Sequence, residues 1–166
     1  MMTDEHNNFI ETWGSMGVLW GINRSMARIH AFVMLCEEPV DLETVSSELR
    51  ISRGNASMSL KELRNWGVIH RVHISGDRRD FYVAEPDIWK MLFSIARVRK
   101  EREFDPALEA LRGLLGNAGL EKGSGVYTRM NDLEKSCSKF DRIMMKALGN
   151  EKRSRMMLDL LAFYKD

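Results

Sequence analysis

Apolar residues in the first 40 positions recur at the spacings of three and four that are typical of amphipathic helices. A first stripe predicts a helix over residues 4–20 and consists of Phe9, Trp13, Met16 and Trp20. A second helix is expected to begin after Asn23, a good N-cap residue, and to end before Pro39. Its apolar positions are Met26, Ile29, Val33 and Cys36. Two helices are therefore expected before residue 40.

Residues 41–67 predict a helix, a tight turn and a second helix. Asp41 caps the short stripe of Leu42, Val45 and Leu49, and Ser52 caps the second helix. That helix has the sequence SRGNASMSLKELRNWG and is expected to end at Gly67. The face that can pack on the preceding helices consists of Ala56, Leu60, Leu63 and Trp66. The opposite face consists of Gly54, Ser57, Met58, Lys61 and Asn65, with Arg53 and Arg64 at its margin.

Two short runs after Gly67, VIHRVHI and DFYVA, are rich in β-branched and aromatic residues. They are joined by SGDRR, which contains turn-forming residues. The pattern predicts a β-hairpin with Arg78 and Arg79 at or near its tip.

The remaining chain predicts helices. One begins near Asp87, and another is expected to start at a break, with Asp105 as its cap and Pro106 as its first position, and to end at Gly116. GNAGLEKGSG, residues 116–125, predicts a flexible loop. Beyond the loop, apolar residues alternate spacings of four and three, which predicts a packing seam of the coiled-coil type. This seam consists of Val126, Met130, Leu133, Cys137, Phe140, Met144 and Ala147. A last helix over residues 151–164 completes a fold that is mainly α with a small β-hairpin.

Composition limits the class of protein. The chain has 166 residues, of which 44% are hydrophobic and 30% charged, as expected for an ordinary soluble globular protein with one core. No apolar run approaches the roughly 18 residues of a membrane span, so no membrane association is expected. The start, MMTDEHNNF, carries acids and does not resemble a secretory signal, so we expect a cytoplasmic location.

The net charge of +1 is unevenly distributed. Residues 50–79 carry seven basic side chains and two acidic ones, whereas residues 1–49 carry two basic and eight acidic ones. The basic excess therefore coincides with the second helix of the helix-turn-helix and with the hairpin.

Enzymatic chemistry has little support. The sequence has no nucleophile elbow, nucleotide loop, paired carboxylate motif or metal-ligand spacing, so we expect no enzyme, no cofactor and no metal. His30, His70 and His73 are candidates for metal ligands, but they lack an acidic or thiol partner at ligand spacing, which favours structural or DNA-facing roles. Cys36 and Cys137 allow a redox sensor, but their positions on apolar stripes favour packing.

A helix, a turn, a helix and a basic hairpin, in that order, is the layout of a winged helix-turn-helix. The major groove admits one helix, whose N-terminal side chains read base edges. Arg53 can donate two hydrogen bonds to guanine, Asn55 can pair with adenine, and Met58 can pack on a thymine methyl group. Ser57 and Ser59 can reach bases or phosphates.

Backbone contacts can come from the same region. Gly54 lets the helix backbone approach DNA closely, and Lys61 and Arg64 suit phosphates, as do the two arginines of the hairpin tip, which also suit a minor groove. The predicted DNA-binding residues are Ser52, Arg53, Gly54, Asn55, Ser57, Met58, Lys61, Arg64, Arg78 and Arg79.

The segment ISRGNASMSLKELRNWGVIHRVHISGDRRDFYVAE resembles the GbsR-like branch of the MarR superfamily of transcriptional regulators. The resemblance extends from about Met26 to Trp89 and, more loosely, over the leading helices and as far as Gly116. It implies an obligate homodimer whose N- and C-terminal helices intertwine, with two winged domains on a palindromic operator. In this family Asp77, Arg78 and Arg79 match a wing motif in which an Asp braces an Arg that enters the minor groove.

The resemblance also defines the expected domains and elements. Residues 1–24 are expected to form an N-terminal dimerisation helix, residues 25–86 the winged helix-turn-helix, and residues 87–166 a C-terminal helical dimerisation region. The recognition helix would be Ser52 to Trp66 and the wing Ile69 to Val83.

A small-molecule effector is expected from the same resemblance, since GbsR-like proteins are associated with responses to choline or glycine betaine. Trp13, Trp20, Trp89 and Tyr127 are candidates for an aromatic cage around a quaternary ammonium group, although aromatics at helical spacing also suit a core.

We therefore predict a homodimeric regulator, acting as a repressor, that binds double-stranded DNA and is released by an effector. The alternative is a winged-helix module for protein interaction or dimerisation without specific DNA binding, which the near-neutral total charge favours. The two hypotheses differ in the expected salt dependence of DNA binding.

Overall fold

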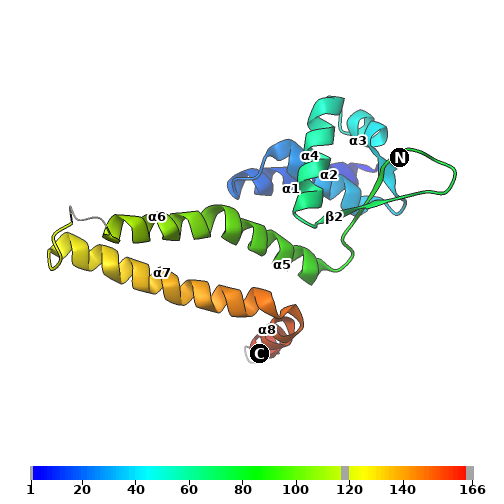
Figure 1. Ribbon diagram of the computed structural model, residues 1–166. Helices are drawn as coiled ribbons and strands as arrows, with labels where there is room; N and C mark the ends of the chain where they lie inside the picture. Colours follow the sequence, from blue (N-terminus) through cyan, green and yellow to red (C-terminus); the bar gives the residue numbers. More distant parts are fainter. Residues whose placement is uncertain (1, 117–119, 164–166) are drawn as a thin grey trace. The chain divides into compact units, whose positions relative to one another are not determined.

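The computed structural model describes residues 2–116 and 120–163 (Figure 1). The chain divides into two compact units, Met1–Met91 and Leu92–Asp166. The first contains four helices and a three-stranded sheet, and the described part of the second is helical. The expectation of a mainly α fold with a small β wing is confirmed.

The first unit has four complete helices, and the last three of them begin at the predicted caps. The four are α1 (Asp4–Leu19), α2 (Arg24–Leu35), α3 (Leu42–Glu48) and α4 (Arg53–Asn65). The Asn23 side chain accepts from the amides of Ser25 and Met26 ahead of α2. Asp41 accepts from the Thr44 amide ahead of α3, and Ser52 accepts from the Asn55 amide ahead of α4. Each cap satisfies N–H groups that a helix start leaves without a partner.

Helix α1 packs on α2 through its small residues. Its buried positions are Ile10, Gly14 and Gly17, whereas Trp20, at the end of the predicted stripe, is 51% exposed. A Cβ atom on Gly17 would lie 2.5 Å from the Cβ of Ala27, so only glycine permits this approach. The middle of the predicted aromatic stripe, Trp13 and Met16, is half-buried, and its two ends are exposed. The stripe therefore lies beside the most deeply packed positions of α1 and does not coincide with them. The expected N-terminal dimerisation helix lies in the same compact unit as the helix-turn-helix, and its role in a dimer stays a prediction.

The sheet contains one strand more than the predicted hairpin. Strands β2 (Ile69–Val72) and β3 (Phe81–Ala84) pair antiparallel, and β1 (Val40–Asp41) pairs with the other edge of β3. Strand β1 has only two residues, too few for a period-two pattern, and lies directly before α3. The sheet thus connects the wing to the helix-turn-helix through Asp41.

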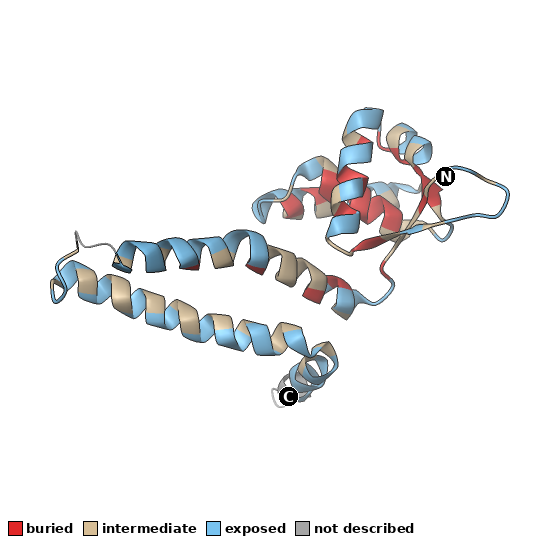
Figure 2. Ribbon diagram, viewed as in Figure 1, coloured by how far each residue is buried: buried red, intermediate tan, exposed pale blue. Residues whose placement is uncertain are grey.

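The core of the first unit lies between its helices and the sheet, as the buried residues of Figure 2 show. The most deeply buried large side chains are Phe32, Ile29, Leu60, Ile69, Val33, Val45 and Val68. Helix α4 contributes to this core with Ala56, Leu60 and Leu63, which are all at most 2% exposed. The predicted packing face of α4 is therefore confirmed, with Trp66 half-buried at its end.

The second unit begins within α5 (Ile88–Arg99), which continues through a π-helical segment, η1 (Lys100–Phe104), into α6 (Asp105–Gly116). The predicted break at Asp105 and Pro106 is wrong, because Asp105 has helical φ and ψ angles of −62° and −46°. A π turn is wider than an α turn, which allows the chain to accept the missing N–H of Pro106 without ending the helix. The buried Lys100 stabilises this segment through ion pairs with Asp105 at 2.5 Å and Asp141 at 2.8 Å.

The last two helices are α7 (Gly125–Gly149) and α8 (Glu151–Phe163). Ion pairing between Arg112 and Glu134 at 3.0 Å joins α6 to α7. The predicted loop 116–125 lies partly, and Tyr164 entirely, outside the described residues. No described helix is long and apolar enough to span a membrane.

Candidate nucleic-acid interface

Helix α4 presents a continuous polar face away from the core. Its members Arg53, Gly54, Ser57, Met58, Lys61 and Arg64 are all exposed. Met58, a large apolar side chain, is 69% exposed beside these polar residues. The structure therefore brings six of the predicted DNA-binding residues together on one side of the helix.

Gly54 has no structural reason to be glycine within the chain. A Cβ atom built at this position would meet no atom within 4 Å among the described residues. Glycine disfavours a helix by up to about 1 kcal/mol relative to alanine. The backbone of α4 is therefore accessible at Gly54, and a binding partner can approach it more closely than it could approach a residue with a side chain.

Asn55 and Ser59 point toward α2 instead of the outer face. Asn55 Nδ2 donates to Ser25 Oγ at 3.1 Å, and Ser59 Oγ donates to Asn55 Oδ1 at 3.2 Å. Ser59 is only 8% exposed, so the prediction that it reaches bases or phosphates is wrong. These hydrogen bonds join α4 to α2 through Asn55. Recognition of adenine by Asn55 remains a prediction, and it requires Asn55 to exchange these bonds for bonds to the base.

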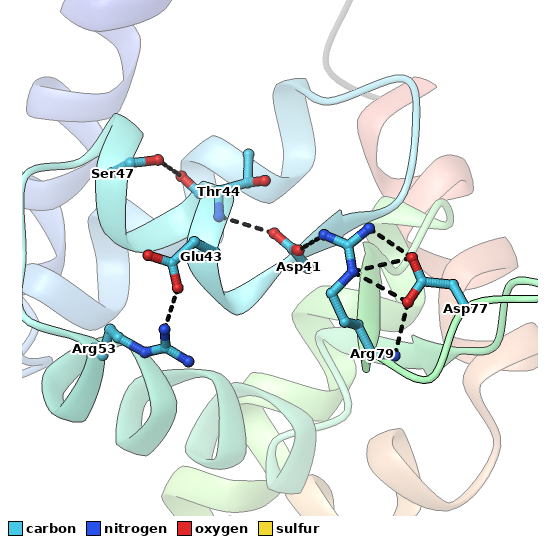
Figure 3. A network of polar contacts seen from close by, with 7 residues as sticks. All are labelled: Asp41, Glu43, Thr44, Ser47, Arg53, Asp77 and Arg79. Carbon is cyan, nitrogen blue, oxygen red and sulfur yellow. Dashed lines mark hydrogen bonds and ion pairs between the residues drawn. The ribbon is translucent and has the colours of Figure 1, made fainter.

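Arg53 is engaged with α3, as Figure 3 shows. Its Nη1 forms an ion pair with Glu43 Oε2, and the two side chains are 68% and 62% exposed. Exposed ion pairs contribute little to stability, about 0–1 kcal/mol. The pair holds Arg53 near the start of the helix and can be exchanged for a partner in DNA.

Arg79 is the braced arginine of the wing. Its Nε donates to both carboxylate oxygens of Asp77, at 3.1 and 3.0 Å, and its amide donates to Asp77 Oδ1 at 2.9 Å. These hydrogen bonds lower the pKa of Asp77 to about 2. The Arg79 guanidinium also lies over the Phe81 ring, 5.0 Å from its centroid.

A second carboxylate, Asp41, connects the wing to α3 (Figure 3). Asp41 forms an ion pair with Arg79 Nη1 and accepts from the Thr44 amide at 2.8 Å. Burial acts to raise the pKa of Asp41, but the bonds from Thr44 and Arg79 lower it below its ordinary value. The sequence predicted Asp41 as a cap only, because its pairing with a residue 38 positions away leaves no periodic signal.

Arg78 differs from its neighbour. It is exposed, and no ion pair or hydrogen bond joins it to another residue in the described part of the chain. Of the two wing arginines, Arg79 is tied to the domain and Arg78 is available to an external partner.

A buried carboxylate fastens the wing to the start of α5. Glu85 is 5% exposed, and its Oε2 lies 2.8 Å from His70 Nε2 and 2.6 Å from Lys90 Nζ. Burial acts to raise the pKa of Glu85, but hydrogen bonds from Lys90 and His70 bring it down to about 2. This cluster, which the sequence did not predict, gives His70 a structural role.

The predicted aromatic cage remains a prediction. Trp13 stacks on Phe9, with ring centroids 5.7 Å apart, and lies 6.0 Å from the buried His30, whose pKa burial lowers to about 4. Trp20 and Trp89 lie in the same unit as Trp13. Tyr127 lies in the second unit.

The sequence left two alternative sites, a metal site and a redox-sensing cysteine. Among the described residues, no group of three or more His, Cys, Asp or Glu side chains lies close enough together to hold a metal ion. Burial and the nearby Glu48 raise the pKa of the Cys36 thiol, which disfavours the reactive thiolate.

Comparison with known proteins identifies relatives. No family model matches the chain. The transcriptional repressor GbsR of Bacillus subtilis is 27% identical over 93 residues, which cover 56% of this chain and 51% of that protein. The chain thus spans about half the length of this curated relative. A crystal structure of a transcriptional regulator aligns with a TM-score of 0.66 and 23% identity, over 87% of this chain and 96% of that one.

The match to GbsR confirms the resemblance that residues 51–85 indicate, and the crystal structure supports the winged-helix fold. The chain is therefore a winged helix-turn-helix protein similar to the GbsR-like regulators of the MarR superfamily.

Proposed function

We propose that the protein is a sequence-specific DNA-binding transcriptional repressor that acts as a homodimer on a palindromic operator. The observation that carries this proposal is the exposed face of α4, which combines Arg53, Gly54, Ser57 and Met58 in its first two turns. Side chains near the N-terminus of a recognition helix are those that reach base edges in the major groove.

Sequence reading is assigned to the start of α4. Arg53 exchanges Glu43 for the O6 and N7 atoms of guanine, which form a bidentate pair worth about 1–3 kcal/mol of discrimination. Met58 packs on a thymine methyl group. The Ser57 hydroxyl donates a hydrogen bond to a phosphate, or donates to or accepts from a base edge.

Contacts with the DNA phosphate backbone are assigned to the exposed cations around that face. Lys61 and Arg64 lie one and two turns further along α4 and suit phosphates. Arg79, which Asp77 and Asp41 brace and which is 61% exposed, enters the minor groove, and Arg78 contacts the phosphates beside it.

The proposed homodimer rests on the apolar residues that α7 leaves exposed. Val126, Leu133 and Phe140 recur every seven residues and are 52–54% exposed, whereas Met130, Cys137 and Met144 are half-buried. One edge of the predicted seam therefore remains available for a second copy. Two winged units related by a twofold axis would bind half-sites about one helical turn, roughly 34 Å, apart.

Selection of bound fragments from random duplex DNA tests the proposal. We expect an enriched palindrome, and we expect Arg53→Ala to weaken binding by about 1–3 kcal/mol while relaxing one base position in each half-site. Lys139→Ala, which removes an exposed charge on α7, is the matched control and should leave the selected sequence unchanged.

The alternative of an interaction module without DNA predicts a different outcome. A regulator loses affinity steeply as salt increases, because each neutralised phosphate releases a counterion. Absence of an enriched sequence, together with weak and salt-insensitive binding, would exclude the proposed function.

A further inference from the structure

The second unit contains a cavity at the corner between α7 and α8. It has a volume of about 580 Å³, and α5 contributes one wall. Its apolar lining consists of Phe93, Ile143, Ala147, Met157 and Leu158. Pockets of about 300–1,000 Å³ with mainly apolar walls are typical of small-molecule sites. The corner is therefore large enough for an organic ligand.

The charged residues of the lining are all cationic. Lys146 on α7 and Arg153 on α8 line the cavity, and no Asp or Glu does so among the residues that the structure describes. Within the described residues, neither cation has a carboxylate at ion-pairing distance. The cavity therefore combines apolar walls with two positive charges that no described carboxylate neutralises.

The corner is held in shape by bonds that do not use these two cations. Arg97 Nη2 donates to the Leu148 carbonyl at 3.3 Å and to Glu151 Oε1 at 2.8 Å. Ser154 Oγ donates to the Ala147 carbonyl at 2.8 Å, which links α8 to α7. Glu151, the acid at the start of α8, thus pairs with Arg97 and is not among the residues that line the cavity.

We propose that this cavity binds an amphipathic organic anion, a carboxylate with an aliphatic or aromatic body. The apolar body is removed from water by the walls, and the carboxylate pairs with Lys146 and Arg153. A quaternary ammonium compound of equal size is disfavoured by the same two charges. The site is distinct from the predicted aromatic cage, and only its role as an effector site rests on the proposed function.

The binding test uses the full chain without DNA and three ten-carbon probes below their micelle concentrations. The probes are decanoate, decyltrimethylammonium and decanol, compared by isothermal titration calorimetry. We expect decanoate to bind at least tenfold more tightly than either of the other two. Equal or tighter binding of decyltrimethylammonium would overturn the assignment of an anion.

Charge and shape variants test whether the cavity is the site. We expect the double variant Lys146→Gln and Arg153→Gln to lose at least tenfold in decanoate affinity, and Ile143→Trp, which fills the cavity, to lose as much. Lys152→Gln is the control, because Lys152 is exposed on the first turn of α8 and does not line the cavity. Circular dichroism establishes that each variant folds.

Unchanged decanoate binding in the charge variant would also overturn the proposal. So would absence of binding in the wild type combined with a change of oligomeric state in Ile143→Trp, since a second copy would then fill the cavity. A separate measurement of operator affinity with and without decanoate tests the regulatory role. Failure of operator binding would reject the proposed function and leave the calorimetric result unaffected.

Discussion

The two compact units of the chain differ in how far their residues are buried (Figure 2). The first unit surrounds Phe32 and Ile29 with helices and a sheet. In the described part of the second unit, only Phe93 and Leu108 are buried apolar residues, and α7 buries none in its 25 residues. The difference indicates that the first unit has its own core, whereas the described part of the second leaves most of its apolar side chains at least partly exposed. This exposure is why we propose the second unit as the site of dimerisation.

The largest effect is expected in the core of the first unit. Phe32→Ala should lower the free energy of unfolding by about 3–5 kcal/mol, because Phe32 is 2% exposed and its loss leaves a cavity. Urea denaturation of the dilute chain measures the change. Phe140→Ala removes the same side chain from a site that is 52% exposed and should cost less than about 1 kcal/mol. Similar costs at the two sites would contradict the contrast between the units.

The next largest effect is expected on self-association, at the edge of α7 that exposes Val126, Leu133 and Phe140. Leu133→Glu should weaken self-association by about 2–4 kcal/mol, since it introduces an unpaired charge into the proposed interface. Sedimentation equilibrium measures the dissociation constant. Lys135→Glu places an acid at an exposed position on another side of α7 and serves as the control. An unaltered association constant for Leu133→Glu would exclude this edge from the interface.

An effect of intermediate size is expected for the Glu85 cluster, which links the wing to α5. Glu85→Gln should lower the free energy of unfolding at pH 7 by about 1–3 kcal/mol, the range for hydrogen bonds to charged groups. Because the folded pKa of Glu85, about 2, is below its ordinary 4.5, its contribution is fully present above about pH 4.5 and disappears as the pH falls through 2. Denaturation curves from pH 7 downward should therefore converge for the wild type and the variant.

A second acidic residue, Asp80, serves as the control for the general effect of removing a negative charge. Asp80→Asn removes the exposed partner of Arg71 and should change stability by less than about 1 kcal/mol. If the difference in the free energy of unfolding between the wild type and Glu85→Gln persists unchanged to pH 2, the ionised cluster is not its source.

The smallest effect concerns the face of α4. Gly54→Ala should stabilise the free protein by up to about 1 kcal/mol, since the added methyl group meets nothing in the chain and alanine favours a helix. The same variant should weaken operator binding, because the backbone can no longer approach the groove. Thermal unfolding and a gel-shift titration measure the two changes. A variant that is more stable and binds equally well would leave Gly54 without a functional explanation.

Local chemistry predicted much of the fold. The caps Asn23, Asp41 and Ser52 were visible in the sequence because a capping side chain acts on amides two or three positions away. The packed face of α4 was visible for a similar reason, since Ala56, Leu60 and Leu63 repeat with the period of one helix.

Contacts between distant segments were not predictable in this way. Helix α1 packs through Gly14 and Gly17 because α2 supplies residues that require close approach, and the aromatic stripe gave no sign of it. Likewise, Ser59 had the chemistry of a base reader, but α2 covers it. Pro106 predicted a break, yet the π-helical segment and the buried Lys100 carry the helix past it.

The sequence by itself determined the order of the elements, the polar face of α4 and the local excess of basic charge, because each depends on neighbours within a few turns of the chain. Only the tertiary structure decided which polar residues remain on that face, which carboxylates hold Arg79, and where a cavity lined by two cations forms. These features arise between segments that are far apart along the chain, such as Asp41 and Arg79, which are 38 positions apart. Their pairing depends on how the elements pack and leaves no period in the sequence.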